Sequence, residues 1–113
     1  MIPYFEEADV AVTVCDKEGR IIEMNRQSVQ VNQKGDQSLI GSNVLDCHPE
    51  PARSQLQAMM TGQIKNVYTI EKGDVHKLIY QIPWYQGGEY AGFMELSMVI
   101  PAQMPHKVRK PKA

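Results

Sequence analysis

The chain has 113 residues, a formal net charge of −1 at pH 7, 42% hydrophobic residues and 22% charged residues. This length fits one domain that buries about two-thirds of the surface of its unfolded chain, and the composition excludes global disorder. The charge gives no electrostatic footprint for nucleic acid, and no apolar run approaches the roughly 18 residues of a membrane span. The N-terminus carries acids where a signal peptide needs bases. We therefore expect a cytoplasmic protein with two free thiols.

A β-hairpin is predicted near the start of the chain. Residues 10–16 are apolar and β-branched, and residues 20–25 follow as the expected partner strand. Between them, Gly19 can adopt the positive φ that a short hairpin loop often demands.

Short helices are predicted after the hairpin. Asn25 is a good N-cap for a first helix, which we expect to stop at Gly35. Residues 36–49 are broken by glycine and proline and suit one or two single-turn helices. A longer amphipathic helix is expected from residue 51 to a C-cap at Gly62. Its apolar face is formed by Ala52, Leu56, Met59 and Met60.

Three strands in a meander are predicted at residues 66–71, 75–85 and 89–100. Pro83 has no N–H, so its strand should be an edge or bulged there. Each of the last two strands alternates between an apolar face, which we expect to be buried, and a wetter face. In the middle strand the apolar face is Leu78, Tyr80, Ile82 and Trp84, opposite Lys77 and Gln81.

The element order indicates an α+β fold, in which one five-stranded antiparallel sheet carries the short helices and the longer helix on one face. A cleft is expected between the sheet and the helices. Residues 1–100 are interpreted as a single domain, and residues 101–113 as a polar, basic tail.

Three segments resemble the PAS domain, and the resemblance extends over residues 4–100. "CDKEGRIIEMN" contains Asp16, Gly19 and Asn25 in the arrangement of the family's first hairpin. "LIGSNVLD" is similar to the stretch before the family's long helix, and "GEYAGFMELSMVI" resembles its closing strand, with Gly92 where a family glycine usually lies. "CHPEPAR" also resembles a subgroup of bacterial PAS domains that has Cys-His-Pro before the long helix.

The resemblance implies a sensory or interaction module that binds a small molecule in the cleft and is not an enzyme. It also implies a homodimer and an effector protein on another chain, since no effector follows in this sequence. The ligand and any cofactor are left open.

Four interpretations of the pair Cys47-His48 are considered. Structural zinc needs three or four ligands, and the sequence has no C-x-x-C or H-x-x-x-H spacing. A nucleophilic thiol needs a base, and adjacent side chains point apart in most backbones. The third interpretation is haem ligation by His48, because some PAS domains bind haem through a histidine near the long helix. The fourth is that the pair forms the start of the helix, with Cys47 as a small buried hydrophobic residue.

Two functional alternatives accompany the ligand-binding sensor: a haem-dependent gas or redox sensor with His48 as axial ligand, and a ligand-free dimerisation domain. The candidate cleft residues are Met24, Leu45, Cys47, His48, Leu56, Met59, Met60, Tyr80, Trp84, Met94 and Leu96.

Overall fold

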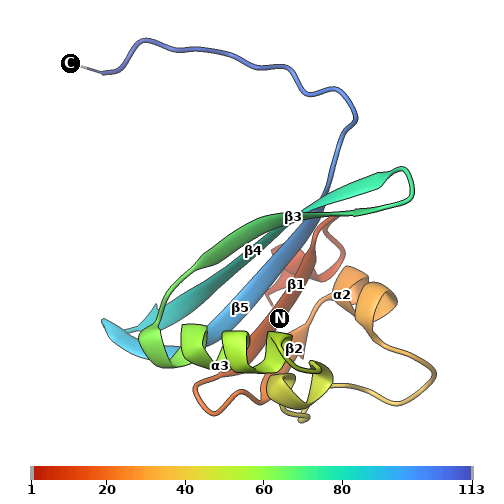
Figure 1. Cartoon of the computed structure of the whole chain (residues 1–113), viewed down its shortest axis with the longest axis vertical. Helices are drawn as coiled ribbons and strands as arrows, with labels where there is room; N and C mark the ends of the chain where they lie inside the picture. Colours follow the sequence, from red (N-terminus) through yellow and green to blue (C-terminus); the bar gives the residue numbers. More distant parts are fainter. Residues whose placement is uncertain (1, 113) are drawn as a thin grey trace.

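The computed structural model describes residues 2–112 and contains one five-stranded antiparallel sheet (Figure 1). The strands are β1 (Ala11–Asp16), β2 (Ile21–Met24), β3 (Asn66–Lys72), β4 (Val75–Gln86) and β5 (Glu89–Ile100). Their order across the sheet is β2-β1-β5-β4-β3. The helices are α1 (Pro3–Glu6), α2 (Arg26–Asn32), the 3₁₀ helix η1 (Val44–Cys47) and α3 (Ala52–Gly62). The predicted α+β fold is confirmed.

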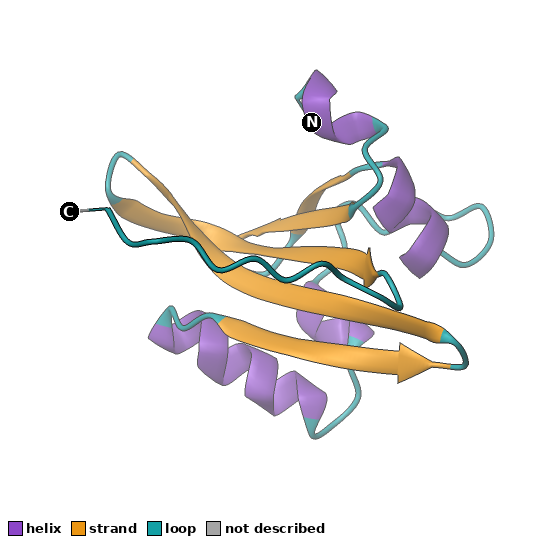
Figure 2. Ribbon diagram, turned by 90° about the horizontal axis from the view of Figure 1, so that it is seen from above, coloured by secondary structure: helices purple, strands orange, loops and turns teal. Residues whose placement is uncertain are grey.

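The helices lie on two sides of the sheet. Helix α3 and η1 lie along one face, and α1 lies beyond the opposite face (Figure 2). We call the face under η1 and α3 the inner face, and the other the outer face. Helix α1 was not predicted from the sequence. Among the described residues, no helix has the length and apolar character needed to cross a membrane.

The hairpin turn is fixed by Asp16, whose Oδ1 accepts hydrogen bonds from the backbone N–H of Glu18 at 3.0 Å and of Arg20 at 2.9 Å. Gly19 has a φ of 90°, as predicted, and a Cβ at this position would lie 2.9 Å from Oδ1 of Asn43. Because Asn43 also caps η1, accepting from Leu45 N–H at 2.9 Å, the turn and the start of η1 are held together. Glycine is therefore needed here for both conformation and space.

Asn25 caps α2 as predicted and is fully buried. Its Oδ1 accepts from the N–H of Val12 at 2.9 Å and of Ser28 at 3.0 Å. Its Nδ2 donates to the carbonyls of Phe5 and Val10, both at 2.7 Å. One side chain thus joins α1, β1 and α2 and satisfies four backbone groups.

The predicted helix ends need correction. Helix α2 ends at Asn32, before Gly35, and its last turn closes where Gln33 N–H donates to the Val29 carbonyl. At the end of α3 the left-handed residue is Gln63, with a φ of 54°, while Gly62 is still helical. The last three strands match their predicted ranges to within one residue.

Pro83 lies where the prediction required an edge or a bulge. Strand β3 ends its pairing with β4 at Asn66, opposite Gln81, so β4 has no β3 partner at Pro83. A bulge follows between Trp84 and Tyr85. The missing N–H of the proline therefore leaves no ladder hydrogen bond unmade on that side.

The expected burial of the two faces is reversed. On the inner face, Ile79, Gln81, Phe93 and Ser97 are only 3–8% exposed. The apolar residues on the alternate positions of β4 and β5 lie on the outer face and are half-buried: Leu78, Tyr80, Ile82, Trp84, Met94, Leu96 and Met98. The expectation that this apolar face is the buried one under the helices is wrong.

Strand β5 ends at Ile100, and residues 101–112 contain no helix or strand and run away from the sheet (Figure 1). Residues 1 and 113, the outer limits of the predicted domain and tail, lie outside the described residues. The division at residue 100 remains a prediction.

Candidate functional site

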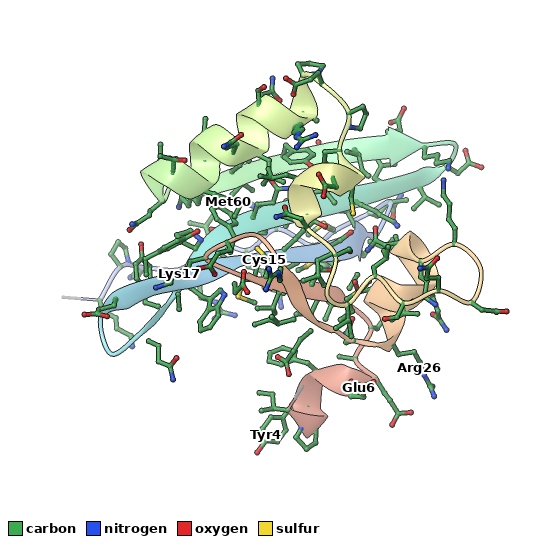
Figure 3. The ribbon with its side chains drawn as sticks, turned by 90° about the horizontal axis from the view of Figure 1, so that it is seen from below. Tyr4, Glu6, Cys15, Lys17, Arg26 and Met60 are labelled. Atoms are coloured by element: carbon green, nitrogen blue, oxygen red, sulfur yellow. The ribbon has the colours of Figure 1, made fainter. Side chains whose placement is uncertain are left out.

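A cavity of about 60 Å³ lies between the inner face of the sheet and the helices η1 and α3. Its apolar wall is a buried cluster of Cys15, Leu56, Met60 and Phe93. Figure 3 shows Met60 of α3 and Cys15 of β1 in this part of the molecule, away from Tyr4 and Glu6 of α1. The cavity is thus the predicted cleft between sheet and helices, and we call it the inner cavity.

A row of polar side chains crosses the inner face beside the apolar cluster. Asn66 of β3 is paired with Gln81 of β4, Gln81 with Glu95 of β5, and Glu95 with Thr13 of β1. Asn66 Nδ2 donates to Gln81 Oε1 at 3.2 Å, and Gln81 Nε2 donates to Glu95 Oε1 at 2.9 Å. Since directly opposite residues in neighbouring strands share one face, the register brings these four side chains together. We call them the polar row.

The polar row continues beyond the sheet into α2. The hydroxyls of Thr13 and Ser28 form a short hydrogen bond, and Ser28 is completely buried. Asn32 Nδ2 donates to the Ser28 carbonyl at 3.1 Å. This end of the row is therefore fixed by packing and hydrogen bonds.

His48 follows η1 as its C-cap and borders the inner cavity. Its Nδ1 lies 2.8 Å from the carbonyl oxygen of Val44. A carbonyl can only accept, so Nδ1 carries a proton, and in the neutral ring Nε2 is an acceptor. The neighbouring Cys47 is exposed, with Sγ 3.7 Å from the Asn43 carbonyl. The two adjacent side chains thus have different environments.

An open groove of about 340 Å³ adjoins the inner cavity, and the two spaces share His48, Leu56 and Gln81. The groove extends to Met59 of α3 and Tyr68 of β3. Partial burial raises the pKa of the Tyr68 hydroxyl above its ordinary value of 10.0, and the negative charge of Glu95 raises it further. Tyr68 is therefore a neutral phenol at neutral pH, available to donate or accept a hydrogen bond.

Within residues 2–112, no group of three or more His, Cys, Asp or Glu side chains is placed to hold a metal ion. Burial raises the pKa of the Cys15 thiol, and the nearby charge of Asp16 acts in the same direction, against a hydrogen bond from the backbone of Phe93. A raised pKa reduces the thiolate fraction, which is the nucleophilic form. The structure therefore gives Cys15 the environment of a packing residue.

A model of the PAS fold matches residues 5–100. The chain belongs to the PAS fold family. The match gives no information on the Cys-His-Pro subgroup, which remains a prediction. A search of curated proteins finds no significant match.

Solved structures of PAS domains share the fold at low sequence identity. The PAS domain of Bordetella pertussis BvgS has a TM-score of 0.66 and 17% identity, over 88% of this chain and 83% of that one. The PAS domain of the histidine kinase ThkA has a TM-score of 0.64 and 17% identity, with 80% and 99% covered. A Vibrio cholerae Aer2 receptor structure, described as a dual PAS-haem oxygen sensor, has a TM-score of 0.62 and 19% identity, with 81% and 95% covered. PAS domains are generally sensory modules without catalytic activity.

The PAS domain brings some of the predicted cleft residues together. Those bordering the inner cavity or the adjoining groove are His48, Leu56, Met59, Met60 and Met94, although Met94 belongs to the outer face of β5 and also borders a hollow on that side. Leu45 borders a separate hollow beside Met60, while Met24 is buried at the end of β2 and borders none of the described hollows.

The other predicted cleft residues lie elsewhere. Tyr80 and Leu96 lie on the outer face, since they precede and follow Gln81 and Glu95. Trp84 borders an outer hollow between α1 and the sheet and donates from Nε1 to the Cys15 carbonyl at 2.9 Å. Cys47 is exposed to solvent.

The polar row was missed as a site in the sequence. Gln81 was assigned to the wetter face of its strand, where solvent was expected, and Glu95 belongs to the corresponding face of the last strand. Asn66 and Thr13 carry no local signal, because only the strand register aligns them with Gln81 and Glu95. A five-stranded order predicted with its register would have revealed the row.

The residues around the cavity do not fit haem in this conformation. Nε2 of His48 could face an iron, but an inner cavity of about 60 Å³ has room for only a few water-sized groups, far less than a porphyrin needs. Gln81 and Glu95 also present polar atoms where a porphyrin needs an apolar pocket. Haem would require α3 and η1 to move away from the sheet.

Proposed function

We propose that this PAS domain is a non-catalytic sensory module that binds a small molecule in the inner cavity and its adjoining groove. The observation that carries the proposal is a cavity with an apolar wall and a few convergent polar groups, which is the usual composition of a small-molecule site. The proposed contacts among the predicted residues are His48, Leu56, Met59 and Met60.

Native mass spectrometry of the freshly purified protein, followed by a ligand screen read by backbone amide NMR shifts, tests the proposal. A ligand in the cavity should shift the resonances of Leu56, Met60 and Gln81, while Gly73 in the β3–β4 turn, which borders neither the inner cavity nor the groove, should not move. A protein that purifies empty and shows no cavity shifts with any compound would contradict a sensor and favour the ligand-free dimerisation domain.

We also propose that the outer face forms a homodimer and that the signal passes to an effector on another chain. The support is the half-buried apolar face of β4 and β5, together with exposed apolar side chains of Ile2 and Phe5 near α1. Contiguous apolar surface of this kind usually marks an interaction site, and a second copy offers the same surface in return.

Light scattering coupled to size exclusion tests the dimer. Leu96→Glu places a charge on the outer face and should give a monomer, whereas Val99→Glu, at an exposed position of the same strand, should leave the dimer intact. If Leu96→Glu has the same mass as the wild type, the outer face is not the interface.

A separate experiment tests the haem-sensor alternative. The protein is mixed with haemin, and the Soret band of the wild type is compared with that of His48→Ala. An identical spectrum in the variant would exclude His48 as the axial ligand. The cytoplasmic location also remains a prediction, supported by the two cysteines being free thiols.

A further inference from the structure

Glu95 places a carboxylate on the inner face of the sheet, beside the inner cavity. It lies on β5, between Gln81 of β4 and Thr13 of β1. Among the described residues, no Lys, Arg or His side chain forms an ion pair with it. Glu95 is half-buried, and a carboxylate that lies beside an apolar wall without a charged partner is a candidate ligand contact.

The hydrogen bonds around Glu95 all run in one direction. Asn66 donates to Gln81, and Gln81 donates to Glu95. A carboxylate has about four acceptor sites, and the side chain of Gln81 fills one of them. The remaining lone pairs of the Glu95 carboxylate can therefore only accept hydrogen bonds.

His48 adds a second acceptor on the opposite wall. Its Nδ1–H is bound to the Val44 carbonyl, so Nε2 is the ring atom that is left to accept a hydrogen bond from a ligand, and the residue borders the cavity. Thr13, the neighbour of Glu95 on the other side, has its hydroxyl engaged with Ser28. A ligand that matches the cavity must therefore supply donors.

The apolar cluster defines the rest of the ligand. Leu56 borders both the inner cavity and the groove, and Met60 and Phe93 complete the apolar wall next to Glu95. The inner cavity, at about 60 Å³, suits a small head group. The groove, at about 340 Å³, has room for a ring or short chain against Leu56 and Met59, although polar side chains also line it.

We propose that the ligand of this cavity is a small organic cation with an apolar body, whose charged nitrogen group donates hydrogen bonds to Glu95. This inference rests on the proposed ligand-binding function and specifies its ligand class. The apolar body lies against Leu56, and His48 Nε2 accepts a second donor. Glu95 acts as a specificity residue, because an anion of the same shape would be repelled by its charge.

The test compares three probes of one shape: benzamidinium, benzyl alcohol and benzoate. Binding is measured by titration of backbone amide NMR shifts in the full chain. We expect benzamidinium to bind most tightly and to shift Gln81, Leu56 and Glu95, with benzoate weakest. Amidinium and carboxylate groups pair through two parallel hydrogen bonds, which favours this probe.

Glu95→Gln is the matched variant, because its amide oxygen can still accept from Gln81 while the charge is lost. We expect benzamidinium to bind this variant about 10-fold more weakly or worse, while benzyl alcohol changes little. Glu89→Gln removes one charge from an exposed position of the same strand and should bind like the wild type. An amide spectrum resembling that of the wild type shows that each variant is folded.

Two results overturn the inference. One is benzoate or benzyl alcohol binding in the cavity as tightly as benzamidinium, and the other is equal benzamidinium binding by the wild type and Glu95→Gln. In either case the proposed ligand-binding function stands, because a probe still occupies the cavity. If all three probes leave the cavity resonances unmoved, the cation inference fails, and the broad ligand screen then decides the proposed function separately.

Discussion

Replacing Asn25 by alanine should strongly destabilise the fold. The substitution removes four hydrogen bonds, but their losses are unequal. The N–H groups of Val12 and Ser28 belong to residues that are at most 2% exposed, so water cannot replace their partner. The carbonyls of Phe5 and Val10 belong to partly exposed residues, and water can reach them. Two buried unsatisfied N–H groups, at about 1–3 kcal/mol each, predict a loss of about 2–6 kcal/mol in the free energy of unfolding.

Urea denaturation monitored by circular dichroism measures this loss. A domain of this kind has a total stability of about 5–15 kcal/mol, so part of the variant could be unfolded without denaturant. Gln30→Ala, on the exposed side of the same helix, is the control and should change stability by less than about 0.5 kcal/mol.

Asn25→Asp separates acceptors from donors at the same position. Aspartate keeps an acceptor for Val12 and Ser28 but turns an oxygen toward the carbonyls of Phe5 and Val10, so it should also destabilise the fold at neutral pH. A loss below about 1 kcal/mol for Asn25→Ala would refute the reasoning, because it would mean that the buried N–H groups find other partners.

Three further predictions concern the region around Cys15. Gly92→Ala should cost about 1–3 kcal/mol or more in the free energy of unfolding and shift Trp84 fluorescence, because a Cβ would lie 2.0 Å from the Cys15 carbonyl and 2.6 Å from the indole nitrogen. An unchanged emission spectrum would argue against that close approach. With a thiol reagent, Cys47 should react fast and Cys15 only as slowly as the protein opens, so Cys47→Ser should abolish the fast phase; fast labelling that persists in this variant would contradict the burial of Cys15. Finally, the free energy of unfolding should fall as the pH rises above 9.0, because the pKa of Cys15 is raised in the folded state and the unfolded chain loses this proton first. Denaturant titrations at increasing pH should show a smaller fall for Cys15→Ala, and identical slopes would exclude this linkage.

The parts of the fold that depend on local chemistry could be predicted from the sequence. The turn at Gly19 needs a positive φ, and the cap at Asn25 needs a short polar side chain, so both are visible in neighbouring residues. The end of α3 was placed one residue early, because Gln63 adopts the left-handed conformation that glycine usually takes. A four-residue helix such as α1 has too short a pattern for periodicity to detect.

The candidate site was harder to predict because it depends on which face of the sheet the helices cover. Alternation along β4 places Tyr80 and Gln81 on opposite faces of the sheet, but it does not indicate which of the two faces α3 covers. Hydrophobicity favoured burial of the face that carries Tyr80, but in the structure α3 and η1 cover the face that carries Gln81. Only the strand order and register bring Glu95 beside Gln81 and opposite the helix that carries Leu56.

The reversal of the two faces connects the proposals made for this domain. A sheet that served stability alone would place its apolar face under its own helices, because that burial is the largest favourable term available. Here the chain directs its more apolar face outward and covers a carboxylate and two amides with α3 and η1. Sequences break such local rules mainly at functional sites. The outer face thus has the composition of a surface that another protein covers, and the inner face has the composition of a site that a donor-bearing ligand completes.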